Sequence, residues 1–158
     1  MRALATVFNH FSVRWQRRFM TAAHSKFVVG VAGLGVDEQG RVLLARHRFG
    51  SPPWRLLGGF IARAERLEEA LWREIHEETG LEAEIGPLLE ASTGRRWAHV
   101  ELVYLFRLRG GAQRTSGEIA EIAWFSPQDL PPVRADQREL IGRHAERAVE
   151  WARSGSRA

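Results

Sequence analysis

Residues 59–81 read GFIARAERLEEALWREIHEETGL, and the second half of this stretch has the spacing of an amphipathic helix. Apolar residues recur there at positions i, i+3, i+4 and i+8, namely Leu67, Ala70, Leu71 and Ile75. A stripe of this kind packs one side of a helix onto a core. Gly80 follows at a position where a left-handed residue commonly ends a helix. We therefore predict a helix over 67–79 that packs on the domain through this stripe.

The opposite side of the predicted helix carries a group of acidic residues. Glu74, Glu77 and Glu78 lie at i, i+3 and i+4, so their carboxylates project from neighbouring positions. Like charges at this spacing destabilise a helix unless a cation lies among them. Mg²⁺ takes oxygen ligands and typically bridges carboxylates to substrate phosphates. From these three residues alone, the group could be either a metal site or an ordinary solvated acidic face.

The residues around the three glutamates favour the metal site. Gly59 is followed by five residues and Glu65, and then by seven residues and the run REIHEETGL at 73–81. This arrangement specifies nine positions over 23 residues, and it resembles the Nudix box without a gap or substitution. The resemblance extends to the sequence on both sides of the box, and only residues 1–25 lie clearly outside it.

The resemblance implies a role for each acidic residue of the helix. Members of the Nudix family hydrolyse pyrophosphate bonds with the help of divalent metal ions. By this likeness Glu74, Glu77 and Glu78 are expected to be ligands of Mg²⁺ or Mn²⁺, with the backbone carbonyl of Gly59 as a further ligand. Glu77 and Glu78 are also expected to take part in catalysis. A glycine suits this place because its backbone can approach a ligand closely.

Other positions of the box are expected to be structural. The resemblance implies that Glu65 and Arg73 pair and brace the loop against the helix, and that Gly80 ends the helix. Glu65 could also be associated with the metal. The chain departs from many relatives in having Leu57 in place of a proline and Ala64 in place of a glycine. Neither departure touches an expected ligand, so we expect them to affect the rigidity of the loop.

Apolar runs on both sides of the box indicate strands. We expect a hairpin of strands at 27–36 and 41–48, a short apolar run at 54–60, and strands at about 83–91, 100–108 and 119–125. A last helix is expected at about 136–153, before a frayed tail at 154–158. The elements follow no regular βαβ order, which favours an α/β domain with a mixed sheet. The resemblance implies a Nudix-type α/β/α sandwich over residues 26–153.

Candidate residues outside the box are less sharply defined. Glu118 is our first candidate for a catalytic base or an additional ligand, and Glu121 is the second, although both could simply be solvated. For substrate binding, the candidates are basic or aromatic: Arg46, Arg48, Trp54 and Arg96. Trp54 could stack on a base or belong to the core. The segment 91–98 contains neither the proline nor the tyrosine that marks two substrate classes of the family, so the group attached to the pyrophosphate stays undefined.

Composition and charge exclude several classes of protein. The chain has 158 residues and no cysteine, which excludes a disulfide scaffold, a thiolate metal site and a cysteine nucleophile. No apolar run approaches the roughly 20 residues that a transmembrane helix needs. The net charge is +4, but residues 1–26 contain five basic and no acidic residues, so the rest of the chain has a net charge of −1. The high isoelectric point is therefore no argument for nucleic-acid binding by the domain.

The basic segment at 1–25 is predicted to be an amphipathic arm. Its large apolar residues recur at spacings of three or four, namely Phe8, Phe11, Trp15 and Phe19. Three roles stay open: packing on its own domain or on a second copy in a homodimer, attraction to a membrane surface or phosphates, and organelle targeting. We expect a cytoplasmic protein.

The sequence thus predicts a Mg²⁺-dependent pyrophosphohydrolase that acts on a nucleoside diphosphate linked to another group, X. Two alternatives remain. One is a pyrophosphohydrolase directed at RNA 5′ ends or polyphosphate, with the basic arm as an electrostatic guide. The other is a Nudix-fold module that senses a nucleotide without cleaving it, which the complete set of box glutamates disfavours.

Overall fold

The computed structural model describes residues 12–14, 26–94 and 98–154. Most of the predicted arm, the candidate Arg96 and all but the first residue of the tail therefore lie outside the described residues. The elements of the domain are β1 (Val28–Gly35), β2 (Val42–His47), β3 (Trp54–Arg55), β4 (Leu57–Phe60), α3 (Leu67–Thr79), β5 (Leu81–Thr93), β6 (His99–Gly111), β7 (Ile119–Phe125) and α4 (Ala135–Ser154). The helix predicted at 67–79 is thus confirmed, and the strands predicted at 83–91 and 100–108 are longer than expected.

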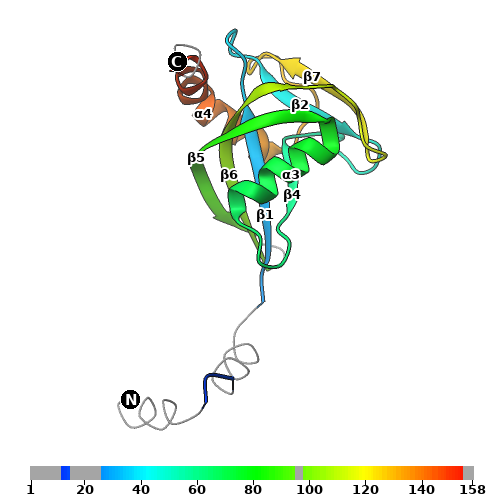
Figure 1. The fold of residues 1–158 in the computed structure, drawn as a ribbon. Helices are drawn as coiled ribbons and strands as arrows, with labels where there is room; N and C mark the ends of the chain where they lie inside the picture. The colour runs from blue at the N-terminus through cyan, green and yellow to red at the C-terminus, as the bar shows by residue number, and fades with distance from the viewer. Residues whose placement is uncertain (1–11, 15–25, 95–97, 155–158) are drawn as a thin grey trace.

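The strands form two sheets (Figure 1). The larger sheet has the order β4-β1-β6-β5, and the smaller one has the order β3-β2-β7. In the larger sheet β1 runs parallel to β6, whereas β4 is antiparallel to β1 and β5 is antiparallel to β6. The predicted mixed sheet is therefore confirmed.

The predicted hairpin is wrong in its pairing, although the chain does reverse where expected. Gly40 has φ +80°, and its N–H donates to the carbonyl of Asp37 at 3.0 Å, which closes the turn. However, β1 and β2 belong to different sheets, and between them only Val36 and Val42 form a bridge. The physical reason is that β6 pairs along one edge of β1 and β4 occupies residues 30–33 of the other edge, so β2 approaches only past the end of β1.

The two helices pack on two separate apolar clusters that involve both sheets, as expected for an α/β/α sandwich. The cluster on the α3 side includes Leu43, Leu57, Leu71, Ile75 and Phe106. The cluster on the α4 side includes Leu34, Leu44, Leu105, Leu140 and Ile141. Successive residues of a strand point to opposite faces, so Leu43 and Leu44 of β2 contribute to different clusters.

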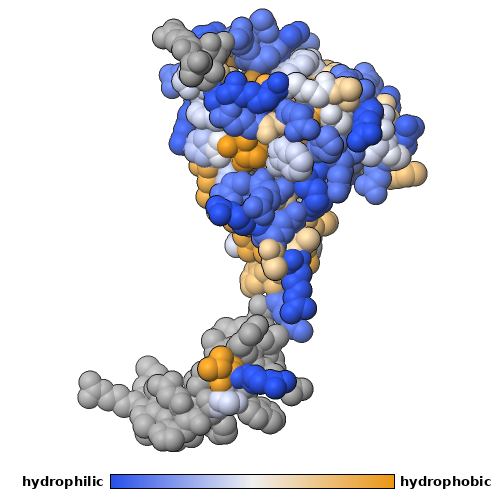
Figure 2. Space-filling view, viewed as in Figure 1, coloured by the Kyte–Doolittle hydropathy of each residue, from blue (hydrophilic) through white to orange (hydrophobic). Residues whose placement is uncertain are grey.

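The surface is largely hydrophilic on the face that Figure 2 shows, with apolar surface gathered where β1 begins. Phe27 and Val28 at the start of β1 and Phe60 at the end of β4 are the exposed apolar side chains at this end of the sheet. Among the described residues, no helix is long and apolar enough to cross a membrane.

Candidate active site

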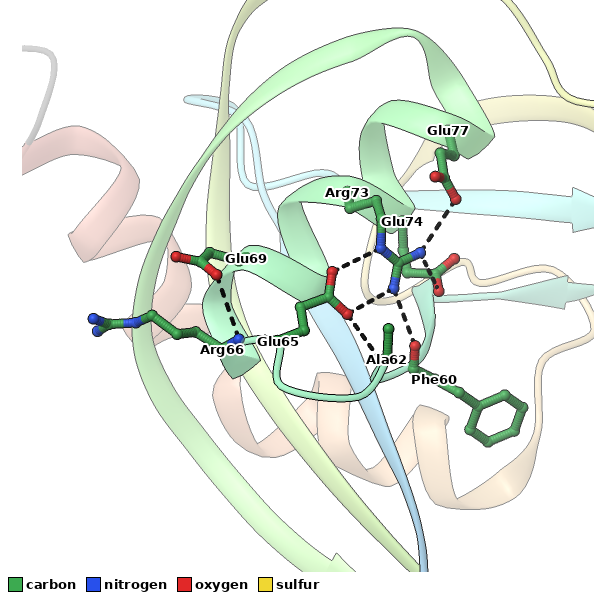
Figure 3. Close-up of polar contacts among 8 residues, drawn as sticks. All are labelled: Phe60, Ala62, Glu65, Arg66, Glu69, Arg73, Glu74 and Glu77. Carbon is green, nitrogen blue, oxygen red and sulfur yellow. Dashed lines mark hydrogen bonds and ion pairs between the residues drawn. The ribbon is translucent and has the colours of Figure 1, made fainter.

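The site is built where β4 meets α3, and Arg73 lies at its centre (Figure 3). Its Nε and Nη2 donate to the two carboxylate oxygens of Glu65 at 2.8 and 3.1 Å. Nη2 also donates to the carbonyl of Phe60 at 3.1 Å. A bidentate ion pair of this kind fixes both partners in orientation as well as in distance. Glu65 and Arg73 are therefore paired in the structure, and their role as a brace of the loop stays a prediction.

The loop between β4 and α3 is held by the same carboxylate. Glu65 accepts the backbone N–H of Ala62 at 2.8 Å, so it ties the loop to α3 through Arg73. The hydrogen bonds from Arg73 and Ala62 lower the pKa of Glu65 from its usual value near 4.5 to about 2. Glu65 is thus fully ionised at neutral pH, and its two oxygens are already used inside the protein.

Arg73 also contacts two of the expected metal ligands. Its Nη1 donates to Oε1 of Glu74 at 2.9 Å and to Oε2 of Glu77 at 3.2 Å. The side chain of Glu74 is 18% exposed and that of Glu77 is 60% exposed, so the first of these contacts is the better shielded from water. Sequence reasoning assigned Arg73 to the loop brace alone and missed these two contacts.

Glu78 lies on the inner side of the acidic group. It is half-buried, and it accepts the backbone N–H of Gly58 at 3.2 Å. Burial is the main cause that raises the pKa of Glu78 to about 8, with a contribution from the charges of Glu74, Glu118 and Glu77 and against the hydrogen bond from Gly58. An acid that is both desolvated and surrounded by other carboxylates marks a candidate functional site.

Gly59 lies directly beside this acidic group. A Cβ at Gly59 would lie 2.4 Å from the Cδ of Glu74, so no other residue fits without moving that carboxylate. The backbone of β4 and the side chain of Glu74 are therefore in close contact. That Gly59 and Glu74 bind the same metal ion stays a prediction. Gly80 has φ +70° and ends α3 in the left-handed conformation that was predicted for it.

The donor set fits a hard divalent cation. Its side-chain donors are all carboxylates, and burial together with their mutual repulsion raises the pKa of Glu78, so a cation among them would favour the ionised form. In residues 12–14, 26–94 and 98–154, however, no three acidic, histidine or cysteine side chains already surround one point as metal ligands. The contacts of Arg73 with Glu74 and Glu77 show how two of these carboxylates are held in this arrangement.

The structure separates the candidates outside the box into two groups. Glu118, just before β7, is close enough to Glu78 to raise its pKa, and the carbonyl of Glu118 accepts the backbone N–H of Arg48 at 2.9 Å. Glu118 and Arg48 therefore lie near the acidic group. Glu121 forms an exposed ion pair of 3.0 Å with Arg46 instead.

Arg46 and Trp54 lie on the other face of the small sheet. They are opposite each other in the β2–β3 register, and Trp54 belongs to the apolar cluster on the α4 side. Trp54 is only 9% exposed, and its ring packs edge-on against Phe125 with a centroid separation of 4.7 Å. This position fits the alternative in which Trp54 is a core residue.

A cleft of about 940 Å³ opens on the α4 side of the domain. Its apolar lining includes Ala32, Leu56, Val103 and Leu140, and its charged lining includes Glu90, Glu101, Arg134 and Arg143. Leu56 directly precedes β4, which carries Gly58 and Gly59 beside the acidic group. The cleft escaped sequence analysis because its lining comes from segments that are far apart in the chain and share no motif.

Comparison with known proteins agrees with this geometry. Residues 26–144 match the family model described as the NUDIX domain. The chain belongs to the Nudix family. This match covers both sheets, α3 and the first half of α4, and it begins after the basic segment at the N-terminus.

Individual Nudix proteins show the same relationship. The chain is 36% identical over 108 residues to a MutT-like protein from Streptomyces ambofaciens, which covers 68% of this chain and 70% of that protein. It is 30% identical over 121 residues to an ADP-ribose pyrophosphatase from Methanocaldococcus jannaschii, with coverage of 72% and 70%. A Nudix hydrolase structure from Nitrosomonas europaea superposes with a TM-score of 0.69 at 22% identity, over 78% of this chain and 73% of that chain, and shows the shared fold. The expected Nudix hydrolase is thus confirmed.

Proposed function

We propose that this Nudix hydrolase is a Mg²⁺-dependent pyrophosphohydrolase that cleaves the P–O–P bond of a nucleoside diphosphate linked to a group X. The observation that carries the proposal is the environment of Glu78. It is half-buried, and the charges of Glu74, Glu77 and Glu118 add to the rise of its pKa to about 8. Such a concentration of carboxylates is unfavourable by itself and becomes favourable around a divalent cation.

Glu74, Glu77 and Glu78, with the carbonyl of Gly59, would hold the metal. When bound, Mg²⁺ or Mn²⁺ supplies positive charge for the phosphoryl oxygens and lowers the pKa of water. The protein's own contribution is to hold these oxygen donors close together where β4 meets α3. The hydrogen bond of 3.2 Å between Gly58 and Glu78 supports this assignment, because it fixes the inner carboxylate to the strand that carries Gly59.

Glu118 would serve as the base. It is exposed, so water can reach it, and it is near enough to Glu78 to influence its ionisation. A carboxylate at this place can accept the proton of the attacking water, provided that it comes within hydrogen-bond reach in the complex. Arg48 is exposed beside Glu118 and can offer a guanidinium to a phosphate.

The cleft on the α4 side would receive the nucleoside or the group X. Its apolar floor suits a ring, and its charged rim supplies hydrogen-bonding groups. Leu56, which lines this cleft, lies one residue before β4, the strand that carries Gly59. Because one relative is an ADP-ribose pyrophosphatase, ADP-ribose is the first substrate to test.

The test is a substrate panel with product identification. It should contain ADP-ribose, nucleotide sugars, dinucleoside polyphosphates, nucleoside triphosphates and a 5′-capped RNA, each with Mg²⁺, with Mn²⁺ and with a chelator. We expect metal-dependent release of two phosphate-containing products from a nucleoside diphosphate derivative. Glu77→Gln should lower turnover by about 100-fold or more because it removes a ligand. Glu68→Gln, an exposed position in the first turn of α3, is the matched control.

The proposal fails if no member of the panel is cleaved, or if Glu77→Gln turns over as fast as Glu68→Gln. Cleavage of RNA alone would favour the alternative directed at RNA ends. The homodimer, the cytoplasmic location and the role of residues 1–25 stay predictions.

A further inference from the structure

The guanidinium of Arg73 divides its hydrogen bonds between two groups of partners (Figure 3). Nε and Nη2 bind Glu65 and the carbonyl of Phe60, whereas Nη1 points to Glu74 and Glu77. We propose that in the metal-free protein Nη1 takes the place of a cation between Glu74 and Glu77, and that a divalent metal displaces it. Arg73 would thereby set the affinity of the site for metal. This inference rests on the proposed function, because it assumes that these carboxylates bind a metal.

The two groups of contacts allow such a displacement without loss of the fold. Glu65 receives two donors from Arg73 at 2.8 and 3.1 Å, and this pair is fixed at both ends because Glu65 also holds Ala62. Nη1 makes only one hydrogen bond to each of its two partners. Its hydrogen bond to Glu77 is 3.2 Å long, and the side chain of Glu77 is largely exposed. Loss of the Nη1 contacts would therefore leave the brace in place.

Charge explains why a cation is needed there before the metal arrives. Glu74 and Glu77 are neighbours on one side of α3 and both contact Nη1, and the adjacent Glu78 adds a third carboxylate at this place. A guanidinium cannot lose its proton in proteins, so Arg73 supplies a permanent positive charge at this place. A divalent cation carries more charge and takes the same oxygens as ligands, so it competes directly with Nη1.

This role and a purely structural one have opposite consequences when Arg73 is removed. If Arg73 only braces the loop, its loss should loosen β4 against α3 and weaken metal binding. If Nη1 competes with the metal, its loss should destabilise the metal-free protein while the metal binds more tightly. The sign of the change in metal affinity therefore separates the two.

The experiment measures binding of Mg²⁺ and Mn²⁺ alone by titration calorimetry, without nucleotide. For Arg73→Gln we expect a dissociation constant about two- to fivefold lower than for the native chain, the size expected when one partly shielded and one largely exposed ion pair no longer compete. The metal-free melting temperature should fall, and the increase on adding metal should be larger than in the native chain. Arg63→Gln removes the same charge from an exposed position in the same loop, and serves as the matched control. Unchanged or weaker binding by Arg73→Gln, relative to Arg63→Gln, would overturn the inference.

A second measurement uses the native chain and does not depend on the folding of a variant. Side-chain ¹⁵N resonances of Arg73 should respond to saturating Mg²⁺ at Nη1, while Nε, which binds Glu65, changes little. Resonances that do not respond would also refute the displacement. If the native chain binds no metal at all, the proposed function fails with it; if it binds metal and only the response of Arg73 is missing, the proposed function stands.

Discussion

The backbone N–H of Gly58 donates to Oε2 of Glu78 at 3.2 Å, and this bond joins the strand of the Nudix box to its helix. It holds a carboxylate inside the protein at a place where burial and three other acidic residues oppose its ionisation. The bond stabilises the ionised form, but the remaining influences outweigh it and leave the pKa at about 8. Metal binding should therefore be coupled to the loss of a proton.

Metal affinity is expected to rise with pH between about 6 and 9. Glu78 must ionise to bind a cation, so calorimetric titrations in buffers of different ionisation enthalpy should show about one proton released near pH 7. The stability of the metal-free protein should change in the opposite direction with pH. Because the pKa of Glu78 in the folded protein lies above the ordinary 4.5, its contribution to the free energy of unfolding declines as pH rises from about 4.5 to 8. Glu78→Gln should abolish the proton release. Equal heats in all buffers would contradict the expectation.

The brace between Glu65 and Arg73 should show the opposite dependence on pH. The pKa of Glu65 is lowered to about 2, so its contribution to stability is present above pH 4.5 and is lost as pH falls toward 2. Urea unfolding of the native chain and of Glu65→Gln, followed from pH 7 to pH 2.5, measures this. The native chain should be the more stable at pH 7, and the difference should shrink below about pH 4. A difference that is independent of pH would show that Glu65 acts without its charge.

Replacing either of the two adjacent glycines of β4 with alanine should have different effects. In Gly59→Ala the new Cβ meets the carboxylate of Glu74, the mobile end of a side chain, so the fold should survive while metal affinity falls at least about tenfold. In Gly58→Ala it would lie 2.1 Å from the carbonyl oxygen of Val31, with φ at +147°, so the protein should lose about 3 kcal/mol or more of stability. Thermal unfolding and metal titration of both variants test the contrast. Equal losses of stability would contradict it.

Ala64 offers a way to stabilise the loop of the box. It has φ +64°, a left-handed conformation that costs a residue with a Cβ roughly 1–2 kcal/mol. Ala64→Gly should therefore raise the free energy of unfolding by about 1 kcal/mol. Ala62→Gly, two residues earlier and also exposed, is the control and should lower it, because its φ is not positive and glycine only adds freedom to the unfolded chain. If urea unfolding shows no gain in the free energy of unfolding for Ala64→Gly, the loop relaxes the strain at Ala64 without the substitution.

The sequence alone determined the local elements that carry the family's pattern. Helix α3 has the predicted bounds, Leu67–Thr79, because its apolar period and Gly80 are local properties of the chain. Strand β7 also has its predicted bounds, Ile119–Phe125. The identity of the acidic group followed from the spacing of the box.

Only the tertiary structure decided which segments lie side by side. The separation of β1 from β2 depends on pairing with β4 and β6, and the cleft on the α4 side depends on segments from across the chain. The position of Trp54 in the core depends on its contact with Phe125. The guanidinium of Arg73 divides its hydrogen bonds between Glu65 and two metal-ligand candidates, and this division likewise depends on how β4 approaches α3. Spacing along a chain fixes which residues share one face of an element, whereas the neighbours of that face are chosen by packing between distant elements.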